Sequence, residues 1–138
     1  MIYLDSSALL KQYYEEPGSD RIRQILRELN RISTASLSYA EVFSALNRKL
    51  REKEMDGKHY RTAAEAFESD WDRLEVVPLS GEVLSRARTL LEHHDLRAGD
   101  AVQLASALLL AASTSVEFAS ADRRLAWAAR KEGLSAIL

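Results

Sequence analysis

Residues 1–10 read MIYLDSSALL, and this opening stretch decides the fold. Its short apolar run predicts a buried strand over residues 1–5, which ends in the carboxylate of Asp5. A second apolar stretch predicts a short helix over residues 8–14, which ends before the sequence EPG at 16–18. A buried strand followed at once by a helix is typical of an α/β fold.

The rest of the chain repeats this alternation of short apolar runs and helical periods. Apolar runs predict four more strands, over residues 32–35, 74–79, 115–119 and 134–138, with Pro78 marking an edge or a strand end. Helical spacing predicts the following helices: one with Ile22, Ile25, Leu26 and Leu29 on one face, ending at Asn30-Arg31; one N-capped by Ser38, with the stripe Val42, Phe43, Leu46 and Leu50; one with Tyr60, Phe67 and Trp71, after a break at Asp56-Gly57; one capped by Ser80; a buried helix over 101–112; and one over 122–131, ending at Gly133. About five short strands and about seven helices predict an α/β fold with a parallel sheet sandwiched by helices, in a single domain over residues 1–138.

The composition excludes several classes of protein. With 138 residues, 46% hydrophobic and 29% charged, the chain is typical of a globular domain. It has no cysteine, which excludes disulfides, thiolate catalysis and Cys-ligated metal sites. The longest apolar run, residues 107–112, is too short to span a membrane, and the N-terminus does not resemble a signal peptide. We therefore expect a soluble cytoplasmic protein without a membrane anchor.

The net charge of −2 argues against a typical nucleic-acid-binding domain, because such domains are usually basic. The balance changes if several acids are gathered in one site, since setting them aside leaves a small excess of cations.

Four carboxylates are predicted to lie on one rim of the sheet. Asp5 and Asp122 follow strands, and Glu41 and Asp100 lie in the first turns of helices. In parallel α/β sheets, ligands bind at the carboxyl ends of the strands. Four such acids would repel one another without a cation, and oxygen ligands suit a hard ion such as Mg²⁺ or Mn²⁺.

Each acid also has a structural explanation, which the sequence leaves open. Acidic side chains complement the dipole at helix starts. Ser38 and Glu41 match a capping box, and Asp100 or Asp122 could cap its own helix. Asp5 is the exception, because an acid at the end of an apolar strand needs a partner.

The remaining sequence patterns give weaker indications of function than the four acids. The three histidines, His59, His93 and His94, are predicted to lie at the surface, and the known nucleotide-binding and serine-hydrolase motifs are absent. Trp71 and Trp127 are predicted to lie in the core or an interface rather than to stack on bases. Most of the large aromatic side chains are expected in the core, with some in a groove for a partner: Tyr13, Tyr14, Tyr60, Phe67 and Trp71.

Four segments in order resemble the motifs of PIN-domain nucleases. They read IYLDSSAL over 2–9, SLSYAEV over 36–42, LRAGDAVQLA over 96–105 and FASADRRL over 118–125. Together they span essentially the whole chain, and its size most resembles the VapC-type toxins of toxin–antitoxin pairs.

The resemblance implies a metal-dependent endoribonuclease with a PIN-like fold. It implies that the acidic metal-binding quartet is Asp5, Glu41, Asp100 and Asp122, that Ser7 and Ser120 orient the carboxylates or the attacking water, and that the cofactor is Mg²⁺ or Mn²⁺. It also implies an RNA substrate, with transfer or ribosomal RNA expected, a cognate antitoxin and a homodimer.

Two arginines flank the acids of the predicted site. Arg97 and Arg123 are candidates for phosphate contacts with RNA, or for pairing with the neighbouring acids. The sequence also raises two alternative functions. A catalytically silent PIN domain would bind RNA or protein, whereas a phosphatase or phospho-receiver is disfavoured because Ser6-Ser7 follows Asp5 where those proteins need a second acid.

Overall fold

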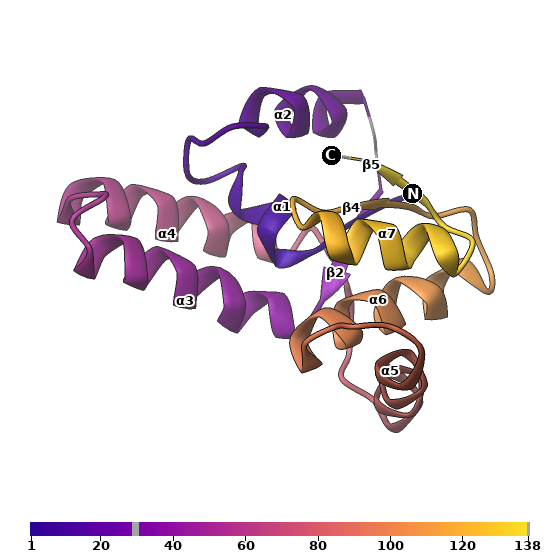
Figure 1. Cartoon of the computed structure of the whole chain (residues 1–138). Coiled ribbons are helices and arrows are strands. Elements are labelled where there is room, and N and C mark those ends of the chain that lie inside the picture. Colours follow the sequence, from indigo (N-terminus) through magenta and orange to yellow (C-terminus); the bar gives the residue numbers. More distant parts are fainter. Residues whose placement is uncertain (29–30, 138) are drawn as a thin grey trace.

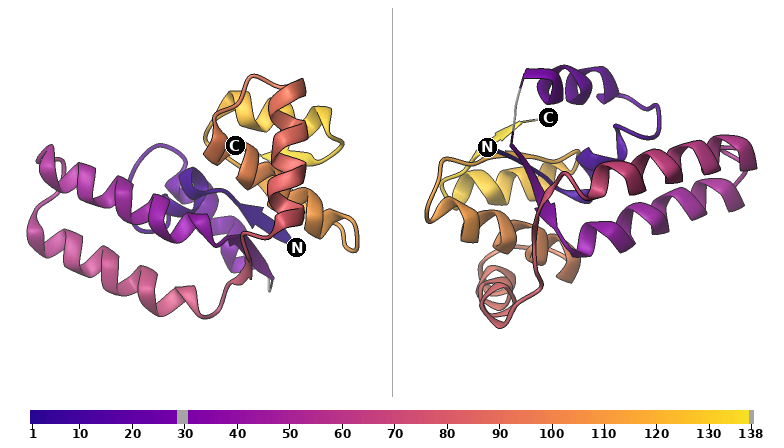
Figure 2. Two further views of the ribbon diagram at one scale, coloured as in Figure 1. Left: turned by 90° about the horizontal axis from the view of Figure 1, so that it is seen from below. Right: turned by 180° about the vertical axis from the view of Figure 1, so that it is seen from behind.

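The computed structural model describes residues 1–28 and 31–137, which form one five-stranded parallel sheet with helices on both faces (Figure 1, Figure 2). The strands are β1 (Ile2–Leu4), β2 (Ile32–Ala35), β3 (Glu75–Val77), β4 (Glu117–Ala119) and β5 (Ser135–Ile137). The helices are α1 (Ser6–Leu10), α2 (Ser19–Glu28), α3 (Leu37–Arg51), α4 (Gly57–Trp71), α5 (Gly81–His93), α6 (Ala98–Ala111) and α7 (Arg123–Lys131). The predicted α/β architecture is confirmed.

The strand order is β3-β2-β1-β4-β5, so the first strand of the chain lies at the centre of the sheet. Ile2 of β1 is in register with Ile32 of β2 on one side and with Glu117 of β4 on the other. Because all four pairings are parallel, the carboxyl ends of the strands meet at one edge. The segments that follow β1, β2 and β4 therefore start from the same edge.

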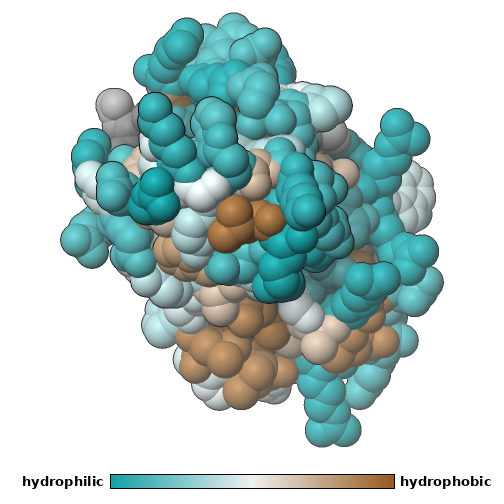
Figure 3. Space-filling model, turned by 90° about the vertical axis from the view of Figure 1, so that its left-hand side faces the viewer, coloured by the Kyte–Doolittle hydropathy of each residue, from teal (hydrophilic) through white to brown (hydrophobic). Residues whose placement is uncertain are grey.

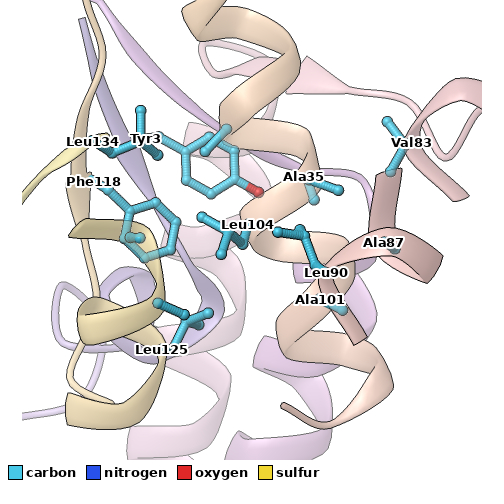
Figure 4. Close-up of a cluster of buried hydrophobic side chains, with 14 of the residues drawn as sticks. Tyr3, Ala35, Val83, Ala87, Leu90, Ala101, Leu104, Phe118, Leu125 and Leu134 are labelled. Carbon is cyan, nitrogen blue, oxygen red and sulfur yellow. The ribbon is translucent and has the colours of Figure 1, made fainter. Parts of the chain in front are cut away.

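Alternate side chains of β1 divide the core into two clusters, as expected from the two-residue period of a strand. Ile2 and Leu4 pack with side chains of α1 to α4 on one face of the sheet. Tyr3 packs on the other face with side chains of α5, α6 and α7. There its ring stacks on Phe118 with centroids 5.6 Å apart (Figure 4). The central strand is thus covered on both faces.

Some helix bounds were predicted wrongly, because side chains cap the helices elsewhere. The helix predicted over residues 8–14 begins at Ser6 and ends at Leu10, since Asp5 caps it directly after the strand. α4 begins at Gly57, because Asp56 accepts a hydrogen bond of 2.8 Å from the backbone N–H of His59. Residues 11–14, which were predicted to continue the first helix, form turns after α1 instead.

Other predictions for the elements are confirmed. Ser80 caps α5, and β3, which precedes Pro78, is an edge strand. Gly133 follows α7 with φ +91°, a backbone conformation that favours glycine. The buried helix α6 begins three residues before the predicted 101–112, and β3, β4 and β5 are shorter than predicted. Leu29, Asn30 and Leu138, which were assigned to elements, lie outside the described residues.

The two tryptophans differ in their surroundings. Trp71 is half-buried against Tyr39 and Phe67 between α3 and α4, where the aromatic side chains were expected to pack. Trp127 is 59% exposed on α7, so of the two predicted locations, core or interface, the core is wrong and the interface stays a prediction. The apolar face of α7 is formed by Leu125, Ala126, Ala128 and Ala129, and Trp127 points away from it.

The surface is mainly hydrophilic on the face that lies to the left in Figure 1, where hydrophobic side chains gather mostly in the lower part, with a smaller patch near the middle (Figure 3). Of the histidines, His59 and His93 are exposed as predicted, and His94 lies 2.6 Å from Glu132. Among the described helices, none combines the length and the apolar character needed to cross a membrane.

Candidate active site

Asp5 ends the central strand and is buried, with 3% of its surface exposed. Its Oδ1 accepts hydrogen bonds from Ser7 Oγ at 2.7 Å and from the backbone N–H of Ala8 at 2.8 Å. Its Oδ2 accepts one from Ser120 Oγ at 2.5 Å. The partners that an acid at the end of an apolar strand requires are therefore two hydroxyls and a helix N-terminus.

The electrostatics of Asp5 reflect this burial. Loss of solvent raises the pKa of the carboxyl from 3.8 to about 6, while the hydrogen bonds from Ser120, Ser7 and Ala8 lower it. The negative charge of Glu41 raises this pKa further. Burial therefore destabilises the ionised form of Asp5, and a nearby cation would stabilise it.

Ser7 and Ser120 tie β1 to the loop after β4. Ser7 Oγ accepts a hydrogen bond from the backbone N–H of Ala121 at 3.0 Å while it donates to Asp5. Ser120 Oγ accepts one from the backbone N–H of Asp122 at 3.0 Å while it donates to Asp5. The two hydroxyls therefore set the position of both aspartates.

Glu41 follows β2 as the fifth residue of α3, just beyond the first turn in which it was predicted to lie. The predicted capping box is wrong, because α3 begins at Leu37 and the hydroxyl of Ser38 is buried and bonds elsewhere. Glu41 Oε1 instead accepts a hydrogen bond from Gln103 Nε2 at 2.7 Å. The cap explanation of Glu41 is excluded, and its carboxylate is available to a site.

Asp100 and Asp122 line one pocket of about 440 Å³ together with Glu41. Asp100 is half-buried in the first turn of α6 and does not cap it, since the N-cap position is Arg97. Burial raises the pKa of the Asp100 carboxyl, and the negative charge of Asp122 raises it further. Asp122 does cap α7: its Oδ1 accepts from the backbone N–H of Arg124 and of Leu125 at 2.8 and 3.2 Å.

The structure brings the four predicted acids to one edge of the sheet, in two layers. Glu41, Asp100 and Asp122 line the pocket, whereas Asp5 lies buried and is joined to Asp122 through Ser120. Within residues 1–28 and 31–137, no group of three His, Asp or Glu side chains is arranged to hold an ion.

The donor set nevertheless fits a hard divalent cation. All four predicted ligands are carboxylates, and the chain has no cysteine, so the predicted ligand atoms are hard oxygens. The negative charge of Glu41 raises the pKa of Asp5, and the negative charge of Asp122 raises the pKa of Asp100. A bound cation would relieve the repulsion in both pairs.

Two arginines border this pocket. Arg97, one of the two predicted phosphate contacts, lines it, and so does Arg124, which also lies 3.2 Å from Asp95. Arg123, the other predicted contact, is exposed at the start of α7 and does not line the pocket. The arginine that lines the pocket together with Asp122 is thus Arg124 and not Arg123.

Gln103 also contacts one of the four acids, although the sequence did not single it out. It is buried, at 2% exposure, and it contacts Glu41 from α6. A signal was present, because Gln103 is three residues after Asp100 and so lies on the same side of a mostly apolar helix. Polar side chains in such a helix need partners.

The fold and the site together define a class: an α/β protein with a parallel sheet and an acidic site at the carboxyl ends of its strands. The sequence model described as the PIN domain matches residues 2–131. The chain therefore belongs to the PIN domain family.

Individual proteins agree with this assignment. The chain is 35% identical over 136 residues to ribonuclease VapC46 of Mycobacterium tuberculosis, covering 99% of this chain and 95% of the relative. Among solved structures, FitAcB from Neisseria gonorrhoeae matches with a TM-score of 0.75 and 18% identity, over 100% of this chain and 97% of that chain. A toxin–antitoxin complex from Klebsiella pneumoniae matches with a TM-score of 0.68 and 16% identity, over 91% of both chains.

Proposed function

We propose that this protein is a metal-dependent endoribonuclease and the toxin component of a type II toxin–antitoxin pair. The observation that carries the proposal is the gathering of Glu41, Asp100 and Asp122 around one pocket, with Asp5 tied to it through Ser120. The similarity to a ribonuclease VapC over nearly the whole chain supports the reaction class.

In this proposal, Asp5, Glu41, Asp100 and Asp122 hold Mg²⁺ or Mn²⁺. When bound, the ion supplies a Lewis acid that neutralises charge developing on the phosphodiester. Ser7 and Ser120 keep both oxygens of Asp5 fixed, because each donates to one of them. Fixed ligands lower the reorganisation needed during the reaction.

The arginines supply the contacts to the substrate. Arg97 and Arg124 face the pocket and would bind the phosphates next to the scissile bond. Arg123 would bind a phosphate further along the strand, since it is exposed on α7. Contacts of this kind position RNA and weaken with salt.

The partners follow from the same reasoning. We propose that a cognate antitoxin binds the protein, that it forms a homodimer, and that it acts in the cytoplasm on transfer or ribosomal RNA. The toxin–antitoxin complex among the similar structures supports the antitoxin.

A cleavage assay tests this function. Purified protein is incubated with a mixed small-RNA pool in Mg²⁺, in Mn²⁺ and in EDTA, beside Asp100→Asn and the control Asp72→Asn, which removes an exposed acid at the end of α4. We expect metal-dependent cuts that Asp72→Asn keeps and Asp100→Asn loses. Equal cleavage by Asp100→Asn would contradict the proposal, and tight RNA binding without cleavage or metal binding would indicate a catalytically silent PIN domain.

A further inference from the structure

The outer face of α7 combines an exposed aromatic ring with cations. Trp127 is 59% exposed, and Lys131 Nζ lies 4.7 Å from the centre of its ring. The other exposed cations of this helix are Arg123, Arg124 and Arg130. Such a face is unusual for a surface helix, because large aromatic side chains are normally buried.

This face adjoins the acidic pocket. Asp122 is the N-cap of α7, and Arg124 lines the pocket three residues before Trp127. Residues three and four apart share a helix face, so Arg123 and Arg124 lie on one side of Trp127 and Lys131 on the other. At a rise of about 1.5 Å per residue, Trp127 lies roughly one helical turn beyond the pocket.

We propose that Trp127 is a stacking platform for a base of single-stranded RNA next to the cleavage site, with Arg123 and Lys131 contacting the flanking phosphates. The assignment of RNA as the ligand rests on the proposed function. The charge of the face favours an anionic partner over an apolar protein surface, and aromatic rings flanked by cations suit single-stranded nucleic acid.

The test uses fluorescence, because Trp71 and Trp127 are the two tryptophans of the chain. In a Trp71→Phe background, Trp127 becomes the sole reporter, and an unstructured RNA oligonucleotide is added in EDTA so that binding is measured without cleavage. We expect saturable quenching. We also expect Trp127→Ala in the wild-type background to weaken RNA binding by about tenfold, with Trp127→Phe close to wild type.

Two results would overturn this inference. One is that RNA binds or is cleaved without quenching Trp127 in the Trp71→Phe protein, while Trp127→Ala keeps full affinity for RNA. The other is a concentration-dependent change in oligomeric state that Trp127→Ala abolishes, which would make this face a contact between copies of the chain. Quenching in EDTA, combined with no cleavage of any RNA when Mg²⁺ or Mn²⁺ is supplied, would instead keep the platform and overturn the nuclease.

A second inference rests on a separate feature, the buried polar chain behind Glu41. Gln103 Nε2 donates to Glu41 Oε1 at 2.7 Å and to Ser38 Oγ at 2.9 Å. Gln103 Oε1 accepts from the hydroxyl of Tyr3 at 2.6 Å. Thr34 Oγ1 donates to the carbonyl of Leu4 at 2.7 Å and lies 2.6 Å from Ser38 Oγ.

The direction of these bonds is determined by the groups at the two ends. Tyr3 is fully buried, and its hydroxyl donates to Gln103 Oε1, while the carboxylate of Glu41 can only accept. The amide oxygen of Gln103 must therefore face Tyr3, and the amide nitrogen must face the carboxylate. The single proton of Thr34 goes to the carbonyl of Leu4, so Ser38 donates to Thr34 and accepts from Gln103.

The opposite oxygen of Glu41 lies beside Gly99. A Cβ at that position would lie 3.1 Å from Glu41 Oε2, closer than most contacts of a Cβ. Glu41 Oε1 thus accepts a hydrogen bond from Gln103, and Oε2 has room because Gly99 has no side chain.

We infer that Gln103 is a positioning residue, which holds Glu41 Oε1 so that Oε2 is presented to a divalent cation. This inference rests on the metal site of the proposed function, and it concerns how a ligand is oriented rather than which ligands exist. Residues that orient a metal ligand through hydrogen bonds have measurable effects on affinity.

Calorimetric titration with Mn²⁺ tests it. Gln103→Met removes the donor at similar size, and Asn47→Met makes the same chemical change on α3, where the amide donates to Phe43 and Tyr60 away from the site. We expect Gln103→Met to weaken Mn²⁺ binding by about tenfold and to lower kcat with KM for RNA unchanged, with Asn47→Met unaffected in both. In a Glu41→Gln background, Gln103→Met should have no further effect on affinity, because it acts through Glu41.

A milder variant covers the case in which Gln103→Met does not fold. Tyr3→Phe keeps the ring and removes only the hydroxyl that fixes the amide, and we expect weaker Mn²⁺ binding in a folded protein. Equal Mn²⁺ affinity in wild type and in the folded variants would overturn the inference and leave the nuclease standing. An absence of Mn²⁺ binding to the wild type would overturn the metal site itself.

Discussion

Asp5 and Asp122 follow neighbouring strands of one sheet, and both cap the helix that comes next. They share Ser120, which donates to the carboxylate of Asp5 and accepts from the backbone N–H of Asp122. Yet Asp5 is 3% exposed, whereas Asp122 is exposed at the pocket beside Arg124. Two acids in equivalent positions therefore stand in opposite solvent environments.

The comparison teaches that burial, and not position along the strand, decides what the charge of each acid does. The charge of Asp5 opposes folding, because burial raises its pKa, and three donors only partly compensate. The carboxylate of Asp122 is solvated, and its Oδ1 caps the start of α7. We accordingly expect Asp5 to be the more rigid of these two proposed ligands and Asp122 the more adaptable one.

The largest expected difference is in catalysis. Asp5→Asn should lower the RNA cleavage rate by about a thousandfold or more, since a metal ion contributes several kcal/mol to phosphodiester cleavage. Asp122→Asn should lower it less, by about ten- to a hundredfold, because an exposed ligand is more easily replaced by water. Single-turnover cleavage of one RNA by both variants checks this order, and a larger loss in Asp122→Asn would reverse the roles assigned to them.

The second difference concerns stability against pH in metal-free protein. The pKa of Asp5 is raised from 3.8 to about 6 by burial, so its protonated form is favoured in the folded state. The stability linked to it is present below pH 3.8 and is lost as the pH rises through 6, by about 3 kcal/mol in total. Urea unfolding in EDTA between pH 4 and 8 should show this decline in wild type and in Asp122→Asn. A decline that persists unchanged in Asp5→Asn would refute the assignment.

Ser120→Ala removes the hydroxyl that the two aspartates share. It should lower the free energy of unfolding by about 2 kcal/mol, because a buried charged acceptor loses a hydrogen bond. Ser113→Ala is the control, since that hydroxyl is exposed and bonds to the carbonyl of Leu110 in its own turn. Urea midpoints near pH 7.5 measure both, and equal midpoints would mean that Ser120 does not support Asp5.

The smallest effect separates capping from charge at Asp122. Asp122→Ala should lower the free energy of unfolding by about 1 kcal/mol, while Asp122→Asn should leave it nearly unchanged, because asparagine also caps helices. Thermal unfolding of the two variants checks this. A similar loss in both would show that the charge, and not the cap, stabilises α7.

Much of the fold could be predicted, because it depends on local patterns. The short apolar runs gave the five strands, and the rim of acids followed from parallel strands ending at one edge. The exposure of Trp127 could also have been predicted. Successive residues of an α-helix are rotated by about one hundred degrees, which places Trp127 opposite Leu125 and Ala129, although its apolar neighbours suggested a buried stripe.

The rest depends on contacts between segments far apart in the chain. Ser38 has the sequence context of an N-cap, but a bond to Gln103, 65 residues away, holds its hydroxyl in the interior. The same bond network explains why Glu41 is not a cap partner. A local motif cannot reveal such competition between a cap and a tertiary hydrogen bond.

The central claim is that buried Asp5 and exposed Asp122 serve one metal site. The most direct test is calorimetric titration with Mn²⁺ of wild type, Asp5→Asn, Asp122→Asn and the control Asp72→Asn. Saturable binding is predicted for wild type and for Asp72→Asn, with affinity weakened by at least about tenfold in each of the other two variants. Equal affinity in all four proteins would contradict the claim.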